Sequence, residues 1–358
     1  MAKSQSYRVV LWGTGAIGTE LLIALLDHRR DLSIVGARVY SDDKHGADIA
    51  TLVDRAPIGV TATTDADEIL ALDADCVLYV PRNTSLDDVC AILASGKNVV
   101  TTAFLFHPRR IDPADRDRLL AACRAGASSV HGSGLNPGNL SGVLPLALSG
   151  MSRRIDRITL QERADWSFYD STAITFDNMA FGQPVEDISP TTNDFLAFNS
   201  GIFSNEVWLI ADALNAGIDE VTATVEAVAA RQDHQIFDHL LRAGTTAGQR
   251  WSWAGRRNGE TLVEIEALWT VGGEYPSHWP KPQHGWTLTI DGDPTMRTHF
   301  LVMAGNPRAS MVEHVTASNT ATAMQILNAV PAVCEAAPGF ATMADLPLIR
   351  SGTGFGNG

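Results

Sequence analysis

Hydrophobic and polar residues over the first 131 positions alternate between short apolar runs and longer amphipathic stretches. The runs rich in β-branched residues predict strands at 8–12, 32–40, 74–80, 98–102 and 127–131. Apolar residues at helical spacing predict helices at 19–30, 86–94 and 115–125. Strands that alternate with helices indicate an α/β fold with a parallel, doubly wound sheet.

From residue 155 the pattern changes to longer strands, with an irregular aromatic segment at 163–183. The expected strands are 155–162, 221–230, 250–256, 262–270, 285–291 and 296–302. The expected helices are 203–216 and 317–330, the second of them ending before Pro331. This half therefore predicts an α+β domain with a mixed sheet. We place domains at 1–142 and 143–314, followed by a C-terminal helix and tail, 315–358, that returns to the first domain.

A glycine-rich motif, GTGAIG, lies between the first predicted strand and the first predicted helix. In this context Gly13 makes a tight turn, Gly15 lets a pyrophosphate approach the backbone, and Gly18 allows the helix to pack closely on the strand. The helix N-terminus offers free N–H groups to the phosphates. The motif predicts a Rossmann dinucleotide-binding domain, with a purely structural glycine turn as the alternative. The expected cofactor contacts are Gly13, Thr14, Gly15, Ala16, Ile17 and Gly18.

Residues after the second strand bear on the choice between NADP and NAD. An NAD-selective site usually has an acidic residue at the tip of this strand. The tip here carries Arg38, Ser41 and Lys44, which would suit a 2′-phosphate, although Asp42 and Asp43 lie in the same stretch. Arg38 and Lys44 could equally be ordinary surface charges. We expect NADP as the preferred cofactor and NAD as the alternative.

Two further segments follow predicted strands at the edge of the sheet where ligands bind in open α/β folds. One is the turn after strand 74–80, and the other is the loop GSGLNPGN after strand 127–131. A domain-linking turn with a helix cap is the alternative for the loop. The residues expected to contact the cofactor here are Pro81, Arg82, Asn136, Pro137 and Gly138.

Composition excludes several classes of function. The chain has 358 residues and a formal net charge of −14, which argues against nucleic acid as a partner. None of its 4 cysteines are spaced as CxxC, so we expect no metal site. No apolar run approaches the ~20 residues that a membrane helix needs. We expect a cytoplasmic protein that does not associate with membranes.

Five motifs in this order carry a family resemblance: GTGAIG, GKNVVTT, GSGLNPGN, MAFGQP and LNAVPAVCEAAPGFATMADLPLI. They resemble the dihydrodipicolinate-reductase-like oxidoreductases that include 2,4-diaminopentanoate dehydrogenase and the native amine dehydrogenases. The resemblance extends over nearly the whole chain. It implies an NAD(P)-binding domain, a substrate domain built on a mixed sheet, and a homodimer formed through that sheet. It also implies interconversion of a ketone plus ammonia with a primary amine.

One expected residue is missing from this pattern. Amine dehydrogenases of the family carry a glutamate just after the strand that matches NVVTT, whereas this chain reads TTAFLFHP at 101–108. Phe104 or Leu105 stands nearest to that position, and neither can stabilise a cationic iminium. The sequence therefore leaves three functions open. They are reductive amination without the usual glutamate, reduction of a ketone or aldehyde, and non-catalytic binding of NADP(H).

Two residues are candidates for proton transfer. His107 titrates near neutral pH and follows the NVVTT strand, but it could also be a loop histidine beside Pro108. Tyr169 could donate a proton to a carbonyl, or it could only line an apolar pocket. The large side chains nearby favour a small hydrophobic carbonyl or amine substrate. The candidate pocket residues are Phe104, Phe106, Asn136, Trp166, Phe168, Tyr169, Phe176, Met179 and Phe181.

Overall fold

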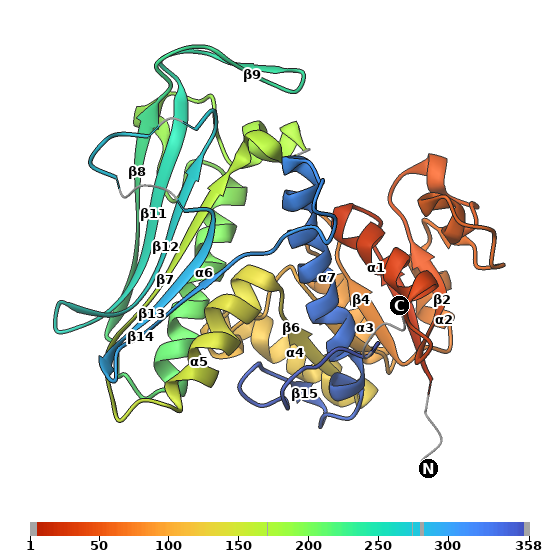
Figure 1. Cartoon of the computed structure of the whole chain (residues 1–358). Coiled ribbons are helices and arrows are strands. Elements are labelled where there is room, and N and C mark those ends of the chain that lie inside the picture. The colour runs from red at the N-terminus through yellow and green to blue at the C-terminus, as the bar shows by residue number, and fades with distance from the viewer. Residues whose placement is uncertain (1–5, 170, 274, 280–282, 354–358) are drawn as a thin grey trace. The chain divides into compact units, whose positions relative to one another are not determined.

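The chain folds into two compact units, shown in Figure 1 as a computed structural model. The structure describes residues 6–169, 171–273, 275–279 and 283–353. Unit 1 comprises Met1–Asn139 and Asn319–Gly358, and unit 2 comprises Leu140–Ser318. The expected α/β class, with a parallel sheet in one part and a mixed sheet in the other, is confirmed.

Unit 1 is built on a seven-stranded sheet in the order β15-β6-β5-β4-β1-β2-β3, whose neighbouring strands are parallel. Side chains of β1 alternate between two buried clusters: Val9 and Leu11 belong to one, and Val10 and Trp12 to the other. Burial on both faces explains why these strands read as continuous apolar runs. The strands are β1 (Tyr7–Trp12), β2 (Leu32–Arg38), β3 (Ala62–Thr63), β4 (Cys76–Tyr79), β5 (Asn98–Thr101), β6 (Ser129–Gly132) and β15 (Gly339–Phe340).

Helices connect these strands, and the last long helix of the chain completes the core of unit 1. The connecting helices are α1 (Ala16–Asp27), α2 (Ala66–Ala71), α3 (Leu86–Ala94) and α4 (Pro113–Gly126). Helix α7 (Met311–Cys334) buries apolar residues of its C-terminal part, including Ile326 and Val330, in the same cluster as Val9 and Leu11. Glu335, directly after this helix, accepts a hydrogen bond from the Tyr7 hydroxyl at 3.0 Å.

Unit 2 is built on a six-stranded mixed sheet in the order β14-β13-β7-β12-β11-β8. Strands β7 and β12 pair in parallel, and the other neighbouring strands described in this sheet are antiparallel. The strands are β7 (Arg154–Asp165), β8 (Glu220–Ala229), β11 (Thr246–Arg257), β12 (Glu260–Thr270), β13 (Gly285–Asp293) and β14 (Met296–Phe300). Two helices, α5 (Leu144–Ser149) and α6 (Asp194–Ala213), and a hairpin of β9 (His234–Ile236) and β10 (His239–Leu241) complete the unit.

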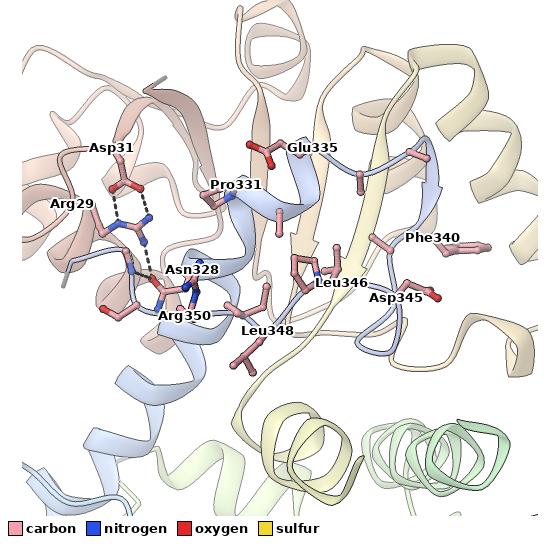
Figure 2. Close-up of a pocket in the computed structure, with 18 residues that line it drawn as sticks. Arg29, Asp31, Asn328, Pro331, Glu335, Phe340, Asp345, Leu346, Leu348 and Arg350 are labelled. Atoms are coloured by element: carbon pink, nitrogen blue, oxygen red, sulfur yellow. Dashed lines mark hydrogen bonds and ion pairs between the residues drawn. The ribbon is translucent and has the colours of Figure 1, made fainter. Parts of the chain in front are cut away.

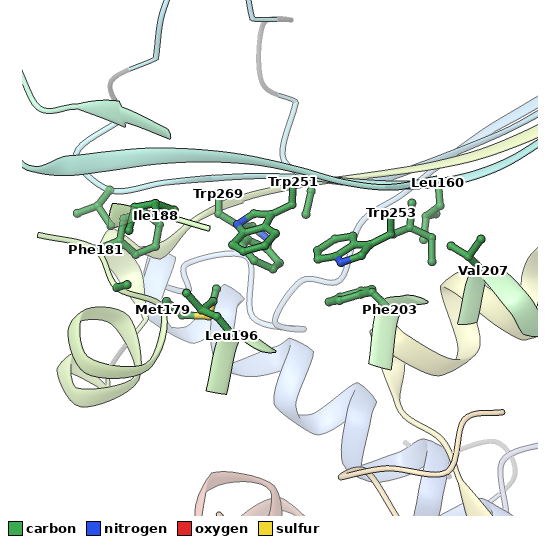
Figure 3. Close-up of a cluster of buried hydrophobic side chains, with 14 of the residues drawn as sticks. Leu160, Met179, Phe181, Ile188, Leu196, Phe203, Val207, Trp251, Trp253 and Trp269 are labelled. Carbon is green, nitrogen blue, oxygen red and sulfur yellow. The ribbon is translucent and has the colours of Figure 1, made fainter. Parts of the chain in front are cut away.

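The core of unit 2 is unusually aromatic (Figure 3). Trp251 and Trp253 of β11 stack with ring centroids 5.6 Å apart, and Phe203 of α6 stacks on Trp253 at 4.3 Å. Trp269 of β12 packs beside them, 6.2 Å from each of the two tryptophan rings. Ser200 accepts a hydrogen bond of 2.8 Å from the Trp253 indole, which satisfies that buried donor. These rings fix one face of the sheet as a rigid aromatic surface against α6.

Several element boundaries differ from the prediction, among them those of β2, α6 and α7. Strand β2 ends at Arg38, two residues earlier than expected. Helix α6 begins at Asp194, because the Asn193 side chain caps it by accepting a hydrogen bond from the Leu196 backbone at 2.8 Å. Helix α7 continues through Pro331, so the prediction that it ends before this residue is wrong. A proline removes one backbone bond, and deep burial of the surrounding apolar residues keeps the helix intact.

Candidate functional site

The GTGAIG loop in unit 1 has the geometry that each of its glycines predicts. Gly13 has φ of 106°, and a Cβ there would lie 2.8 Å from the Val80 carbonyl oxygen, at the end of β4. A Cβ on Gly18 would lie 2.2 Å from the Gly13 oxygen. A Cβ on Gly15 would have nothing within 4 Å, and Gly15 is the N-cap of α1. Two glycines are therefore required by packing, and the third keeps the helix N-terminus open to a ligand.

Arg38, at the end of β2, lies beside this loop, since the Gly13 amide donates to the Arg38 carbonyl at 3.0 Å. Its guanidinium carbon is 5.5 Å from the Trp12 ring centroid and 5.3 Å from that of Tyr40. The Nε and Nη1 atoms of Arg38 are buried without a hydrogen-bond acceptor among the described residues. Buried guanidinium donors normally have acceptors, so these atoms fit an anionic group of a ligand.

The other predicted residues near this edge vary in exposure. The Lys44 ammonium lies 3.3 Å from the Thr14 hydroxyl oxygen, so this side chain reaches the glycine loop. Ser41 and Arg82 are exposed, whereas Pro81 is buried against the Gly13 turn. The ends of β1, β2 and β4 thus lie together around the N-terminus of α1. The residues at these ends fit the pyrophosphate and ribose parts of a dinucleotide.

The GSGLNPGN loop follows β6 and stays within unit 1 up to Asn139. Its two ends are joined by a 2.8 Å hydrogen bond from the Asn139 amide to the Gly134 carbonyl. The Asn139 side chain also donates to Gln325 of α7 at 3.3 Å. The Asn136–Pro137 peptide bond is cis, and Gly138 has φ of 131°, which favours glycine. The two hydrogen bonds of Asn139 hold the end of the loop at the carboxyl edge of the sheet.

Segment 101–108 lies beside the start of this loop. A Cβ on Gly132 would be 2.1 Å from the Phe104 carbonyl oxygen, so the Phe104 backbone passes directly over β6. Phe106 is buried, and His107 is only 5% exposed. His107 also begins a short 3₁₀ turn, Pro108–Arg110. The histidine is thus a largely buried residue near the sheet edge, a position compatible with either of the roles considered for it.

A second histidine, His131 on β6, is buried in the core. Its Nδ1–H donates to the Ala341 carbonyl oxygen at 2.6 Å. Burial of the ring lowers the pKa of His131 from 6.5 to about 4, although the hydrogen bond to Ala341 favours the protonated form. The imidazole is therefore neutral at physiological pH, and its role is to join β6 to the residues after β15.

A cavity of about 750 Å³ opens in unit 1 near Arg29 and the end of α7 (Figure 2). Arg29 forms a two-pronged pair with Asp31 at 2.7 Å and donates to Asn328 at 3.0 Å. Asp31 precedes β2, whereas Gly13 follows β1, so the cavity and the glycine loop lie at opposite edges of the parallel sheet. The cavity is thus separate from the dinucleotide site.

In unit 2, the aromatic residues predicted for a substrate pocket fall into two groups. Trp166 and Tyr169 follow β7, are half-buried, and lie with ring centroids 4.9 Å apart. The Trp166 indole N–H is buried and has no acceptor among the described residues. Phe168 is also half-buried in this turn. By contrast, Phe176 and Met179 pack in the hydrophobic core of the unit.

Glu162 is a buried carboxylate that is not among the candidate residues of the sequence analysis. It lies on β7 in the same phase as Ile158, Leu160 and Ala164, and thus on the aromatic face of the sheet. The carboxylate accepts hydrogen bonds from the Trp269 indole at 2.9 Å and the Trp286 indole at 3.2 Å. The sequence does contain one indication that Glu162 is buried. It is an acidic residue at a position of strand β7 where the alternating pattern places apolar residues.

The opposite face of this sheet carries ordinary ion pairs. Glu266 of β12 pairs with Arg163 and with Arg250, the latter at 2.7 Å. Burial alone would raise the pKa of Glu266, but the two guanidinium groups lower it below its usual value. The Glu266 carboxylate therefore has a structural role in these ion pairs. It can be compared with the carboxylate of Glu162, on the opposite face of the sheet.

Among the described residues, no group of three or more His, Cys, Asp and Glu side chains is arranged to hold a metal ion. In the same part of the chain, no helix has the length and apolar character needed to span a membrane.

Comparison with known proteins assigns the chain to a family. Residues 141–355 match the sequence profile of the 2,4-diaminopentanoate dehydrogenase C-terminal domain. An amine dehydrogenase from Streptomyces virginiae is 30% identical over 364 residues, covering 95% of this chain and 96% of the relative. The chain belongs to the 2,4-diaminopentanoate dehydrogenase and amine dehydrogenase family. It is an NAD(P)-dependent oxidoreductase of the amine dehydrogenase type, and the predicted resemblance is confirmed.

More distant members of the family share the full length of the chain. The 2,4-diaminopentanoate dehydrogenase of Acetoanaerobium sticklandii is 22% identical over 357 residues, covering 97% of this chain and 95% of the relative. The structure of an amine dehydrogenase from Mycobacterium smegmatis matches with a TM-score of 0.75 at 21% identity, covering 98% of both chains. The fold of both units is therefore a family property.

Proposed function

We propose that the protein catalyses the NADPH-dependent reductive amination of a small hydrophobic ketone or aldehyde, together with the reverse oxidation of the amine. The observation that carries this proposal is the 30% identity, over 95% of the chain, to an amine dehydrogenase. In the direction of amination, carbonyl compound, ammonium and NADPH give amine, NADP⁺ and water. The nicotinamide supplies the hydride, and the protein supplies binding, orientation and charge stabilisation.

Unit 1 provides the residues that would hold the dinucleotide. The backbone around Gly15 and the N-terminus of α1 would bind the pyrophosphate, because no side chain occupies that position. The loop that contains Asn136, Pro137 and Gly138 would line the nicotinamide part of the site.

Arg38 supports a preference for NADP over NAD. Its buried, unpaired Nε and Nη1 atoms suit the 2′-phosphate, which is absent from NAD. Lys44, close to Thr14, adds a second positive charge at this edge. A carboxylate at the tip of β2, which would favour NAD, is absent from the sequence at Arg38 to Ser41.

Unit 2 provides an apolar binding surface for the substrate. Trp166 and Tyr169 are half-buried rings that can contact hydrocarbon and keep water away from the reacting carbon. The buried indole N–H of Trp166 is a donor that suits a substrate oxygen. This combination favours a hydrophobic carbonyl compound with one polar group.

The test is oxidation of NADPH and of NADH by the purified protein with a panel of hydrophobic ketones and aldehydes, with and without high ammonium at alkaline pH. Reductive amination requires turnover that depends on ammonium and yields a primary amine. Turnover without ammonium, giving an alcohol, would instead make the protein a carbonyl reductase. Tight binding of NADPH with no turnover of any panel member would favour a non-catalytic NADP(H)-binding protein.

We also propose that the protein is a homodimer formed through the outer face of the unit 2 sheet. That face carries a ladder of charged side chains, among them Arg157 paired with Glu264 and Arg163 paired with Glu266. The family resemblance supports an assembly of this kind. Light scattering coupled to size-exclusion chromatography tests it, and the mass of a single chain at all concentrations would refute it.

A further inference from the structure

Two aromatic rings contact the guanidinium of Arg38 at the edge of unit 1 that carries the glycine loop. Trp12 ends β1 and Arg38 ends β2, and the two residues are direct partners in the pairing of these strands. The Arg38 guanidinium carbon lies 5.5 Å from the centroid of the Trp12 ring and 5.3 Å from that of the Tyr40 ring. Both distances are within the range of a cation–π interaction. One ring from β1 and one from the segment after β2 therefore hold the positive charge of Arg38.

The two rings are also joined to each other. The Trp12 indole N–H donates a hydrogen bond of 2.9 Å to the Tyr40 hydroxyl oxygen. Trp12 is only 1% exposed, and it packs beside Tyr79 with ring centroids 6.0 Å apart. The Tyr79 hydroxyl in turn accepts a hydrogen bond of 2.9 Å from the backbone of Ser85, the N-cap of α3. Packing thus restricts the movement of Trp12, and the hydrogen bond of Trp12 restrains Tyr40.

Tyr40 differs from the other two rings in its exposure. It is 56% exposed, whereas Trp12 and Tyr79 are buried in the core of the unit. Burial of its hydroxyl raises the pKa of Tyr40 above the usual value, although the hydrogen bond from Trp12 acts in the opposite direction. The ring is therefore neutral at physiological pH and does not repel an anion. Its exposure and its contact with Arg38 indicate a role at the site rather than in the core.

Contact with rings differs from an ion pair in what it leaves available on an arginine. Arg29, in the same unit, donates from Nε and Nη2 to the two carboxylate oxygens of Asp31. A ring attracts the cation through its π face and takes up none of its donors. The Nε and Nη1 atoms of Arg38 have no acceptor among the described residues. Arg38 is thus restrained in position while these donors remain available to an anion.

We propose that Trp12 and Tyr40 are positioning residues that hold Arg38 for the 2′-phosphate of NADP and thereby set the preference for NADP over NAD. This inference rests on the proposed function, in which Arg38 binds that phosphate. A guanidinium binds phosphate through N–H groups in a fixed plane, so its orientation decides the strength of the contact. Restraint by the rings reduces the conformational entropy that binding costs. NAD lacks the phosphate, and its affinity does not depend on the two rings.

The first test compares the Kd values of NADPH and NADH for wild type and Tyr40→Leu, measured by isothermal titration calorimetry. Because the Tyr40 ring is exposed, the variant should keep the wild-type melting temperature. The Kd for NADPH should rise about 5- to 20-fold, as expected when one cation–π contact and its restraint are lost. The Kd for NADH should stay nearly unchanged. Equal losses for both cofactors would show that Tyr40 contacts the adenosine part they share, and would overturn the proposal.

Two conservative variants provide matched comparisons. Tyr40→Phe keeps the ring beside Arg38 but removes the acceptor of the Trp12 indole, so it should weaken NADPH binding less than Tyr40→Leu does. Tyr79→Phe removes a hydroxyl that is bonded to Ser85 rather than to Trp12, and should leave the ratio of the two Kd values unchanged. A loss of NADP preference in Tyr79→Phe as large as in Tyr40→Leu would indicate a general disturbance of the rings and would overturn the proposal.

A second test isolates the phosphate from the rest of the cofactor. Adenosine 2′,5′-bisphosphate and adenosine 5′-monophosphate differ only in the 2′-phosphate, and neither carries a nicotinamide. The bisphosphate should bind wild type more tightly, and Tyr40→Leu should lose affinity for the bisphosphate alone. Equal affinities of wild type for the two nucleotides, or an unchanged affinity of Tyr40→Leu for the bisphosphate, would overturn the proposal.

These measurements also separate the proposal from the function on which it rests. Wild-type protein that aminates no carbonyl compound would refute the proposed reaction, and the nucleotide titrations would still decide the role of the two rings. Conversely, an active wild type together with an unchanged ratio of NADPH and NADH affinities in Tyr40→Leu would refute only the role of the rings.

Discussion

The buried histidine on β6 makes the stability of unit 1 dependent on pH in a calculable way. The pKa of His131 falls from 6.5 to about 4 on folding, chiefly because the ring is desolvated. Between these two values the unfolded chain binds a proton that the folded chain does not. The contribution of this residue to stability is therefore complete above pH 6.5 and declines as the pH falls towards 4. The full difference corresponds to about 3 kcal/mol, of which about 2 kcal/mol is lost between pH 7 and pH 4.5.

The perturbation that tests this is His131→Asn, since the asparagine amide can still donate to the Ala341 carbonyl but cannot titrate. Urea-induced unfolding, followed by circular dichroism at pH 7 and pH 4.5, gives the free energy of unfolding at each pH. Hydrogen exchange of the β6 backbone amides reports on the unfolding of unit 1, and so distinguishes it from the unfolding of unit 2. Wild type should lose about 2 kcal/mol more than the variant over this interval. His28→Asn, at an exposed position, is the control. Equal acid losses in wild type and His131→Asn would refute the reasoning.

Three further predictions concern the cofactor loop and the aromatic core. Arg38→Gln should weaken NADPH binding about 10- to 100-fold and leave NADH binding nearly unchanged, as titration of each cofactor by fluorescence would show. Gly15→Ala should keep the wild-type melting temperature but weaken NADPH binding, whereas Gly18→Ala should cost about 1–3 kcal/mol of stability, because its Cβ would clash with the Gly13 carbonyl. Ser200→Ala should cost about 1–3 kcal/mol in urea unfolding, because the Trp253 indole loses its buried acceptor.

Each of these predictions has a result that contradicts it. Equal losses of NADPH and NADH affinity in Arg38→Gln would show that Arg38 acts on the fold or on the shared part of the cofactor. A melting temperature of Gly15→Ala below that of wild type would mean that stability requires a glycine at this position. Unchanged stability of Ser200→Ala would show that the Trp253 indole finds another acceptor.

The cofactor half of the site was predictable because its signal is local. GTGAIG, the strand before it and the helix after it lie within about 20 consecutive residues, and backbone sterics alone determine the role of each glycine. The structure gives Gly13 a positive φ, packs Gly18 against the Gly13 carbonyl and leaves open space around Gly15. Arg38 and Lys44 are also near this loop, as their positions after the second strand predict.

The polar contacts inside unit 2 were less predictable because they are assembled from distant positions. Glu162 is 107 residues from Trp269 and 124 residues from Trp286 in the sequence, and only the pairing of β7 with β12 and β13 brings them together. Aromatic composition alone does not distinguish a pocket from a core. Trp166 is half-buried, yet Met179 in the same segment is fully packed.

The course of the chain has a consequence for its synthesis on the ribosome. Unit 2 is one continuous segment, Leu140–Ser318, so all of its residues have been made before the chain is finished. Unit 1 begins with the first residues but receives Ile326, Leu327 and Val330 of its main cluster only from the C-terminal part of α7. The second unit can therefore fold while the first still exposes an apolar sheet face to solvent and to chaperones. A ribosome that has made the C-terminal residues but still holds those after Ser318 inside its exit tunnel would carry a complete unit 2 and an incomplete dinucleotide-binding unit.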